Sequence, residues 1–481
     1  MNSKSYECCI LGAGPAGLTT ALELIKHGVT DILIIDRNKS VGGLSRTEIF
    51  DNARFDIGPH RFFTKNREIS KIWHDTLGND FQPISRFTRI YYKKKYFNYP
   101  IKAFDVLSKM HPLESIHAML SFMASNIKKS NEVVTFEQWV SQKFGRKLYE
   151  SFFKTYTEKV WGIPCNQISA QWAAQRIKGL DIIKLLKNSL TGGSGNKIKT
   201  LVEEFNYPIL GAGQMYEAMC DRIIEGGADL SLNTDVVSFN NNNSSIESVI
   251  INEPGPKQTK ITAKQFFNSI PLTHFFEKLN PPESQKIQKA VNSLYYRDHI
   301  TVNLLVNGKN LFPDQWIYVH SPQVRAARLA NYNNFSKKMS GHKDKTVLSV
   351  EYFVFKNTKL WAQPDVFYKS LAINELSELG LVKREIVDKV WVTRETECYP
   401  TYYLGFDKYY NILKSRLSEF NNLYAIGRAG MYKYNNQDHS MMSGLLAARN
   451  YLKLSKTSYN LWDININAEY HETLKINNQM E

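Results

Sequence analysis

Cysteine is scarce in this chain, and its distribution excludes two classes of protein. Only five cysteines occur among 481 residues, and none belongs to a Cys-x-x-Cys pair. An odd number of scattered cysteines predicts neither a disulfide framework nor a zinc site, so we expect no bound metal. The pattern is typical of a reducing compartment, and we expect the protein to be cytoplasmic.

Long apolar runs are also missing. No uninterrupted apolar stretch reaches the ~20 residues that a membrane-spanning helix needs, so we expect at most peripheral membrane contact. The first apolar stretch has the pattern of strand, turn and helix, which differs from that of a secretory leader. A formal net charge of +15 favours anionic partners. Nucleic acid is not expected among them, because the chain carries no signature of a nucleic-acid-binding module.

The length of the chain predicts several sub-domains, since one hydrophobic core rarely serves more than ~300 residues. Apolar periodicity predicts a β-α-β unit at the start and a mostly helical region from about 69 to 190. It also predicts a β-rich region from about 301 to 355 and a final helix near 441–452. The expected parts are a Rossmann domain (1–75, 201–265 and 391–460), a helical substrate region (76–200), a β-rich substrate domain (266–390) and a C-terminal tail (461–481).

A glycine-rich turn joins the first predicted strand to the first predicted helix. Gly12, Gly14 and Gly17 form the pattern Gly-x-Gly-x-x-Gly, and Asp36 follows at the end of the second predicted strand. Glycine is needed where a pyrophosphate approaches backbone N–H groups at a helix N-terminus, and the acid can accept hydrogen bonds from ribose hydroxyls. In this setting the motif predicts a dinucleotide-binding site.

The segment after Asp36 favours FAD over NAD. Gly42-Gly43-Leu44-Ser45-Arg46 resembles the segment of the glutathione-reductase-like FAD superfamily in which a glycine pair and a basic residue complete the diphosphate site. The resemblance implies a tightly held FAD contacted by Gly43, Leu44 and Arg46. The implied fold class is α/β, a glutathione-reductase-like Rossmann FAD domain with a helical insertion and a second β-rich substrate domain.

Two later segments extend this resemblance. It implies that the backbone of Val236 or Val237 contacts the adenine. Gly427-Arg428 matches the late strand and turn that closes over the flavin. The residues alone also allow a second interpretation, in which Arg428 contacts FAD and no substrate.

Three segments resemble UDP-galactopyranose mutases and their relatives in the amine-oxidase-like flavoprotein group. They span 58–64, 152–162 and 427–438. The resemblance implies that His60 lies beside the flavin, that Tyr156 stacks on the uracil and that Trp161 lines the sugar pocket. It also implies that Tyr434 contacts the diphosphate. Structural roles stay open for each residue: a turn hydrogen bond for His60, and core packing for Tyr156 and Trp161.

Further candidates come from weaker matches and from the chemistry of a nucleotide-sugar pocket, which needs cations and hydroxyls for a diphosphate. We expect Arg297 and Tyr352 to hold that diphosphate, and Arg176 to lie on a mobile closing loop. Tyr399 and Asn436 complete the expected substrate site, although Asn436 also suits the cap of the final helix. His60, Trp161, Arg176 and Arg297 are the expected catalytic residues.

The predicted activity is that of a nucleotide-sugar pyranose/furanose mutase in cell-surface polysaccharide biosynthesis. The resemblance implies that N5 of the reduced flavin attacks the anomeric carbon while the nucleoside diphosphate leaves. The implied partners are a nucleotide-sugar substrate and a flavin reductant such as NAD(P)H, and a homo-oligomeric state stays open.

Two departures from the mutase pattern affect the substrate. Phe63 stands where mutases have a second histidine, and Asn436-Gln437-Asp438 replaces an acid-Met-acid run. Gly-Pro-His-Arg-Phe-Phe also resembles the protoporphyrinogen-oxidase-like branch. The alternative function is therefore an FAD-dependent oxidase or dehydrogenase of the protoporphyrinogen oxidase, phytoene desaturase or amine oxidase type. A third interpretation makes the FAD purely structural.

Overall fold

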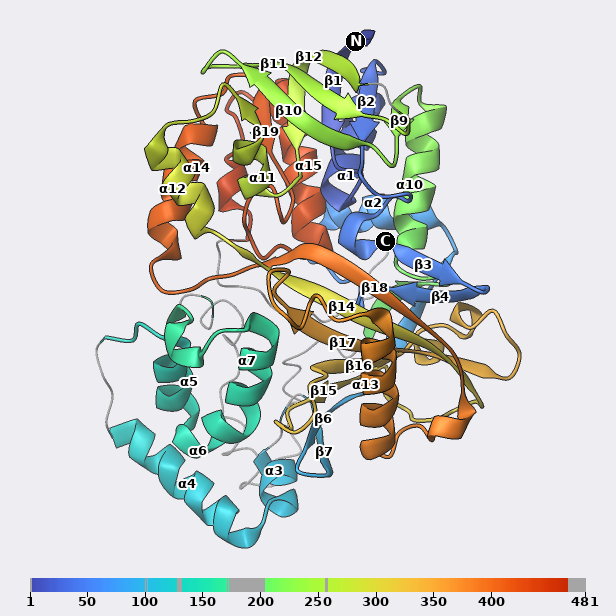
Figure 1. The fold of residues 1–481 in the computed structure, drawn as a ribbon, viewed down its shortest axis with the longest axis vertical. Helices are drawn as coiled ribbons and strands as arrows, with labels where there is room; N and C mark the ends of the chain where they lie inside the picture. Colours follow the sequence, from blue (N-terminus) through green and yellow to red (C-terminus); the bar gives the residue numbers. More distant parts are fainter. Residues whose placement is uncertain are drawn as a thin grey trace, which may run out of the picture.

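The computed structural model describes residues 2–99, 101, 103–127, 132–170, 172, 204–255 and 258–465. Two large sheets and a group of helices make up these residues (Figure 1). In that view the first sheet and its helices form the upper part, the second sheet crosses the middle, and α3 to α7 lie at the lower left.

The first sheet is a mostly parallel Rossmann sheet. Its strands follow the order β13-β10-β11-β12-β1-β2-β9, with β19 paired to β12. The bounds are β1 Asn2–Leu11, β2 Ile32–Ile35, β9 Asp229–Ser231, β10 Asp235–Asn241, β11 Ile246–Asn252, β12 Gln258–Asn268, β13 Leu279–Asn280 and β19 Leu423–Ala425. The last four residues of β1 (8–11) and all of β2 are buried, and both segments are continuous apolar runs, as expected where a sheet is covered on both faces.

Helices cover both faces of the first sheet. One face carries α1 (Pro15–Lys26), α10 (Gly213–Glu225) and α15 (Gln437–Tyr451), with α2 (Arg67–Leu77) beside them. The other face carries α11 (Leu272–Glu277), α12 (Gln285–Ser293) and α14 (Phe406–Leu417). Apolar cores on both sides fix the carboxyl ends of β1 and β2 at a rigid edge, which is where ligands bind in such sheets.

The second sheet is mainly antiparallel, in the order β18-β14-β17-β16-β15-β6-β7. The bounds are β6 Thr88–Tyr92, β7 Lys95–Asn98, β14 Tyr296–Asn307, β15 Trp316–Val319, β16 Arg328–Asn331, β17 Lys345–Val354 and β18 Val387–Pro400. Helix α13 (Asp365–Glu378) packs on one face of this sheet. Two small sheets pair β3 (Thr47–Phe50) with β4 (Ala53–Asp56), and β5 (Phe81–Ser85) with β8 (Glu204–Pro208).

The helical part consists of consecutive helices of 4 to 16 residues. Their bounds are α3 Ala103–Lys109, α4 Pro112–Ile127, α5 Phe136–Phe144, α6 Arg146–Tyr149, a π-helical turn Glu150–Lys154 and α7 Thr155–Trp161. Thr135 and Gln138 form a capping box at the start of α5. Lys159 on α7 donates from Nζ to three carbonyl oxygens of residues 319–326, at 2.8 to 3.0 Å, and so fixes α7 to the second sheet.

The sequence-based expectations agree with most of these elements. The β-α-β start, the β-rich region after residue 301 and the final helix are confirmed. The expected helical region differs, because residues 81–98 form β5, β6 and β7. Strand β5 pairs with β8, and β6 pairs with β15. Both partners are distant in the sequence, so local periodicity does not predict these strands. Strand β12 also continues past the boundary that we placed at residue 265.

Candidate functional site

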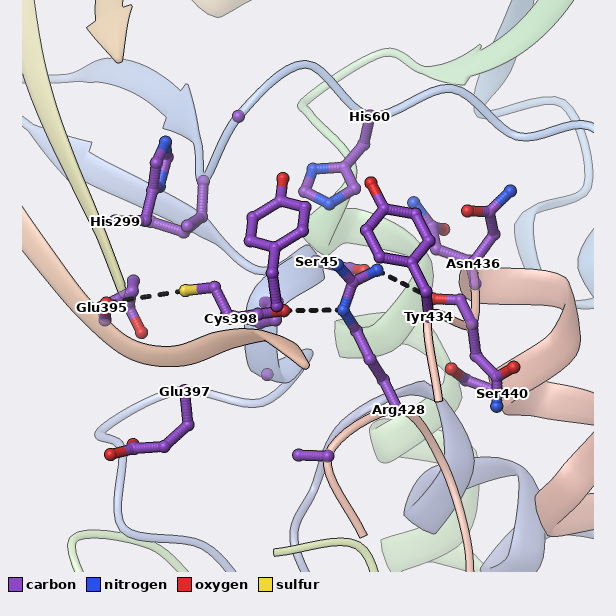
Figure 2. A pocket seen from close by; sticks show the side chains of 18 of the residues that line it. Ser45, His60, His299, Glu395, Glu397, Cys398, Arg428, Tyr434, Asn436 and Ser440 are labelled. Atoms are coloured by element: carbon purple, nitrogen blue, oxygen red, sulfur yellow. Dashed lines mark hydrogen bonds between the residues drawn. The ribbon is translucent and has the colours of Figure 1, made fainter. Parts of the chain in front are cut away.

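A cavity of about 880 Å³ connects the three parts of the fold. Gly12 and Asp36 line it from the first sheet, Arg328 lines it from the second sheet, and Phe136 and Leu148 line it from the helical part. Figure 2 shows its central region, where His60, Arg428 and Tyr434 lie close together. This junction contains most of the candidate residues that the sequence predicts.

The glycine turn after β1 leaves no room for side chains. Gly12 has a φ of +105°, and its N–H donates to the carbonyl of Ile35 at 2.7 Å. A Cβ on Gly17 would lie 1.9 Å from the carbonyl oxygen of Gly12. Helix α1 begins directly after this turn, so its unpaired N–H groups face the cavity. The turn is therefore shaped to receive an anion.

A second glycine approaches the first turn. Gly43 has a φ of +54°, and a Cβ there would lie 3.2 Å from the Cα of Gly14. Leu44 follows within a 3₁₀ turn, Gly43–Ser45, and both residues line the cavity. The two backbone segments form the walls of a narrow groove, and only glycine permits so close an approach of the two backbones. We call this groove, which is the part of the cavity that suits FAD, the glycine groove.

Asp36 lies beside the groove at the end of β2. One carboxylate oxygen accepts the Ala13 N–H at 2.7 Å, and the other accepts the Asn38 N–H at 2.8 Å. Both bonds hold the carboxylate against the glycine turn while it lines the cavity. Each carboxylate oxygen can accept a further hydrogen bond, so the position suits a ribose diol.

Arg46 is more constrained than the sequence suggests. Its Nε donates to Glu48 at 2.7 Å, another nitrogen donates to Glu395 of β18, and a third donates to the carbonyl of Gly43 at 3.0 Å. Two carboxylates therefore balance its charge. Its main effect is to fix the Gly43 turn, so a bound diphosphate depends chiefly on backbone N–H groups.

Val236 and Gly427 also line the cavity. The carbonyl of Val236 accepts a hydrogen bond from Lys278 Nζ. Gly427 has a φ of +76°, and its N–H donates to Ser443 Oγ at 2.8 Å. Together with the glycine groove and Asp36, these residues fit a bound FAD, with backbone at the diphosphate and a carboxylate at the ribose.

Arg428 projects into the cavity between two aromatic rings (Figure 2). Its guanidinium carbon lies 4.5 Å from the ring centre of Tyr399 and 4.1 Å from that of Tyr434. It donates to the carbonyl oxygens of Cys398, at 2.7 Å, and Asn435, at 2.9 Å. Among the described residues no carboxylate forms an ion pair with it. The site therefore contains a fixed cation that can attract an anionic group.

His60 points into the cavity from the loop after β4 (Figure 2). Burial and the nearby Arg328 charge lower the pKa of His60 to about 4. Its Nδ1 atom is buried without a hydrogen-bond partner in the described part of the chain. A neutral imidazole with an unsatisfied ring nitrogen is suited to a hydrogen bond with a bound group.

A buried charged network lies next to His60, and the sequence analysis missed it. Arg328 donates from Nε to one oxygen of Glu351 at 2.7 Å, and His299 lies 2.9 Å from the other oxygen. Arg328 and His299 line the cavity, and Glu351 is fully buried behind them. The Arg328 charge holds the pKa of Glu351 at about 2, against the opposing effect of burial.

One sequence signal could have found this network. His299, Thr301 and Asn303 alternate with apolar residues along β14, and all three are buried. Buried polar residues at every second position indicate a strand face that meets other polar groups instead of a plain core.

Tyr156 and Asn436 also line the cavity, each in contact with neighbouring protein groups. Tyr156 stacks on His320 with ring centres 4.9 Å apart. Asn436 is the N-cap residue of α15, as the alternative interpretation expected. Both positions are compatible with substrate contact, and both also support the wall itself.

Three predicted residues lie outside the cavity wall. Arg297 donates to the carbonyl oxygens of Lys159, Val160 and Phe353, so it caps the end of α7. Trp161 is 2% exposed and packs behind Tyr399 and Tyr434. Tyr352 donates to Glu375 at 2.9 Å within the core of the second sheet. Arg176 lies outside the described residues.

One part of the cavity is apolar. It is bounded by side chains of the helical part and of β6, among them Ile90, Ile101, Phe144, Leu148 and Phe152. Among the described residues no group of three or more His, Cys, Asp or Glu could hold a metal ion, and no helix could cross a membrane.

Two curated relatives match part of the chain. A Klebsiella pneumoniae protein named "Probable UDP-galactopyranose mutase" is 29% identical over 176 residues, which are 35% of this chain and 44% of that protein. The dTDP-fucopyranose mutase of Escherichia coli is 26% identical over 170 residues, which are 34% of this chain and 43% of that protein. The chain therefore spans less than half the length of these relatives.

Comparison of structures confirms the expected fold. A crystal structure of reduced UDP-galactopyranose mutase superposes with a TM-score of 0.83 at 18% identity, covering 97% of this chain and 99% of that one. The sequence profile described as flavin containing amine oxidoreductase matches residues 15–452. Because this match extends over most of the chain, the protein belongs to the flavin-containing amine oxidoreductase family, and FAD is its cofactor.

Proposed function

We propose that this flavoenzyme is an isomerase that interconverts the pyranose and furanose forms of a nucleotide-linked sugar, in the synthesis of a cell-surface polysaccharide. The main support for this proposal is Arg428, a cation at the cavity wall without a carboxylate partner among the described residues. A nucleoside diphosphate that leaves the anomeric carbon develops negative charge, and a fixed guanidinium stabilises that charge. The two mutase relatives support this substrate class.

The reduced flavin would supply the nucleophile for the anomeric carbon. Arg428 then holds the diphosphate, and the rings of Tyr399 and Tyr434 fix the orientation of its guanidinium. The neutral His60 offers Nδ1 to a bound group without adding charge. Arg328 brings a second cation to the wall, but Glu351 balances it, so its role is to shape the pocket.

The apolar part of the cavity favours a second candidate, an FAD-dependent oxidase or dehydrogenase of an apolar substrate. Such enzymes need a slot that buries a hydrophobic molecule, and residues such as Phe144, Leu148 and Phe152 provide one. The two candidates differ in electron balance, because isomerisation consumes no net reductant and oxidation reduces an acceptor in each cycle.

The experiment compares dithionite-reduced and oxidised holoenzyme. UDP-, GDP- and dTDP-linked hexoses and 6-deoxyhexoses are incubated with each form, and the products are separated by anion-exchange chromatography. We expect a ring isomer of equal mass from the reduced enzyme only. Absence of an isomer across the panel, together with oxygen consumption on an apolar amine or porphyrinogen, would establish the oxidase instead.

A further inference from the structure

Helix α4 presents its apolar side chains to solvent. Leu113, Ile116, Met119, Leu120 and Met123 are 71%, 54%, 53%, 59% and 61% exposed. With 3.6 residues per turn, these five positions fall within about one third of the helix circumference. We call them the α4 stripe. A surface helix normally turns such a stripe toward the core, so this orientation is the reverse of the usual one.

The opposite side of α4 holds the helix in place. Ala118 is buried there, and Ser121 Oγ accepts the N–H of Lys147 at 3.1 Å. Gly145, with a φ of +84°, lies so close that a Cβ would be 2.7 Å from the backbone nitrogen of Phe122. These contacts with small and polar groups fix α4 against α6 and leave the stripe outward. In Figure 1, α4 forms the lower edge of the helical part.

Lysines surround one end of the stripe. Lys93, Lys94 and Lys95 are exposed at the turn between β6 and β7. Lys93 Nζ lies 2.6 Å from a carboxylate oxygen of Glu114, which places this turn at the beginning of α4. Apolar side chains bordered by basic ones match the surface of an anionic lipid bilayer.

We propose that the α4 stripe docks on an anionic lipid bilayer, with Leu120 and Met123 among the acyl chains and Lys94 at the headgroups. A second copy of the chain fits less well, because it carries the same net charge of +15 and brings no complementary negative charge. The docking is peripheral, since no described helix could cross the membrane.

This docking also orients the cavity. Helix α4 packs on α5 and α6, and Phe144 of α5 and Leu148 of α6 line the apolar part of the cavity. A docked protein therefore has the apolar end of its cavity on the side of the bilayer.

The test measures co-sedimentation of the holoenzyme with vesicles of phosphatidylcholine, alone or with about one third phosphatidylglycerol. We expect binding to the anionic vesicles that weakens as salt is added. The double variant Leu120→Glu, Met123→Glu should bind at least about tenfold more weakly. Lys94→Glu should weaken binding to anionic vesicles and leave the core intact. Val366→Glu is the matched control, because Val366 is 66% exposed on α13, away from the stripe.

FAD absorbance and the melting temperature establish that each variant is folded. Two results would overturn the proposal. One is wild-type protein that stays in the supernatant with both kinds of vesicle. The other is a dimer seen by light scattering that the Leu120→Glu, Met123→Glu variant converts to a monomer, without any change in vesicle binding. Neither result bears on the proposed isomerase activity, which is assayed with water-soluble substrates.

Discussion

The guanidinium carbon of Arg428 lies over the ring of Tyr434, 4.1 Å from the ring centre, and 4.5 Å from the ring centre of Tyr399. Two backbone carbonyls accept its hydrogen bonds. Aromatic rings and carbonyl oxygens hold a cation in place but leave its charge unbalanced, whereas a carboxylate would hold it and also neutralise its charge. Arg428 differs in this respect from Arg46 and Arg328, whose charges are balanced by glutamates.

Replacement of Arg428 tests its assignment to the substrate. We expect Arg428→Gln to lower kcat/KM for the nucleotide sugar by about 100-fold, the usual loss when one donor to a developing negative charge is removed. Arg428→Lys should recover only part of this, because lysine lacks the planar fork. The flavin-to-protein absorbance ratio should not change. Protein that purifies without FAD would instead assign Arg428 to the cofactor.

Gly43→Ala tests the glycine groove. The new Cβ would lie 3.2 Å from the Cα of Gly14, at a positive φ, so the groove must widen. We expect a large loss of FAD content, measured by flavin absorbance after dialysis. Gly380→Ala is the matched control, since Gly380 has a φ of +70° and open space around it. It carries the same conformational strain of about 1 kcal/mol but should keep its FAD. Equal loss in both variants would contradict the groove.

The groove was predictable because it is local. Gly12, Gly14 and Gly17 lie within one strand, turn and helix, and Asp36 follows at the next strand end. Arg297 and Arg328 show where such reasoning ends. Both lie in strands, but Arg297 turns to carbonyl oxygens 137 residues away at the end of α7. Only the packing of α7 on the second sheet decides which arginine meets the cavity, and no local pattern contains that information.

Glu351→Gln tests the buried network. The substitution leaves the Arg328 charge buried without its partner, so we expect a loss of about 3–5 kcal/mol in the free energy of unfolding. Urea denaturation followed by tryptophan fluorescence measures it. The control is Asp75→Asn, which breaks the 2.7 Å pair of Lys71 and Asp75 on the surface. That change should cost less than about 1 kcal/mol. Similar costs for both variants would show that the network contributes little.

His320 predicts a dependence of stability on pH. Burial, and secondarily the Lys159 charge, lower its pKa from the ordinary value of 6.5 to about 3. The unfolded chain therefore binds a proton at higher pH than the folded one. The contribution of His320 is present above pH 6.5 and is lost as the pH falls toward 3.

The variant His320→Phe keeps an aromatic ring against Tyr156 but cannot titrate. Between about pH 7.5 and about pH 5 we expect it to lose about 2 kcal/mol less unfolding free energy than the wild type. His117→Phe is the control, because His117 is exposed and should leave the slope unchanged. If the unfolding free energy changes with pH equally in the wild type and in His320→Phe, His320 is not a source of acid sensitivity.

Strand β18 belongs to the second sheet, yet its Glu395 accepts a hydrogen bond from Arg46 in the loop that shapes the glycine groove. The same strand supplies the Cys398 carbonyl that orients Arg428. The glycine groove and the second sheet are therefore linked by direct hydrogen bonds. A protein stripped of FAD should lose order along β18 as well as at the glycine turn, so amide hydrogen exchange in residues 395–398, which line the same cavity, would report on cofactor occupancy.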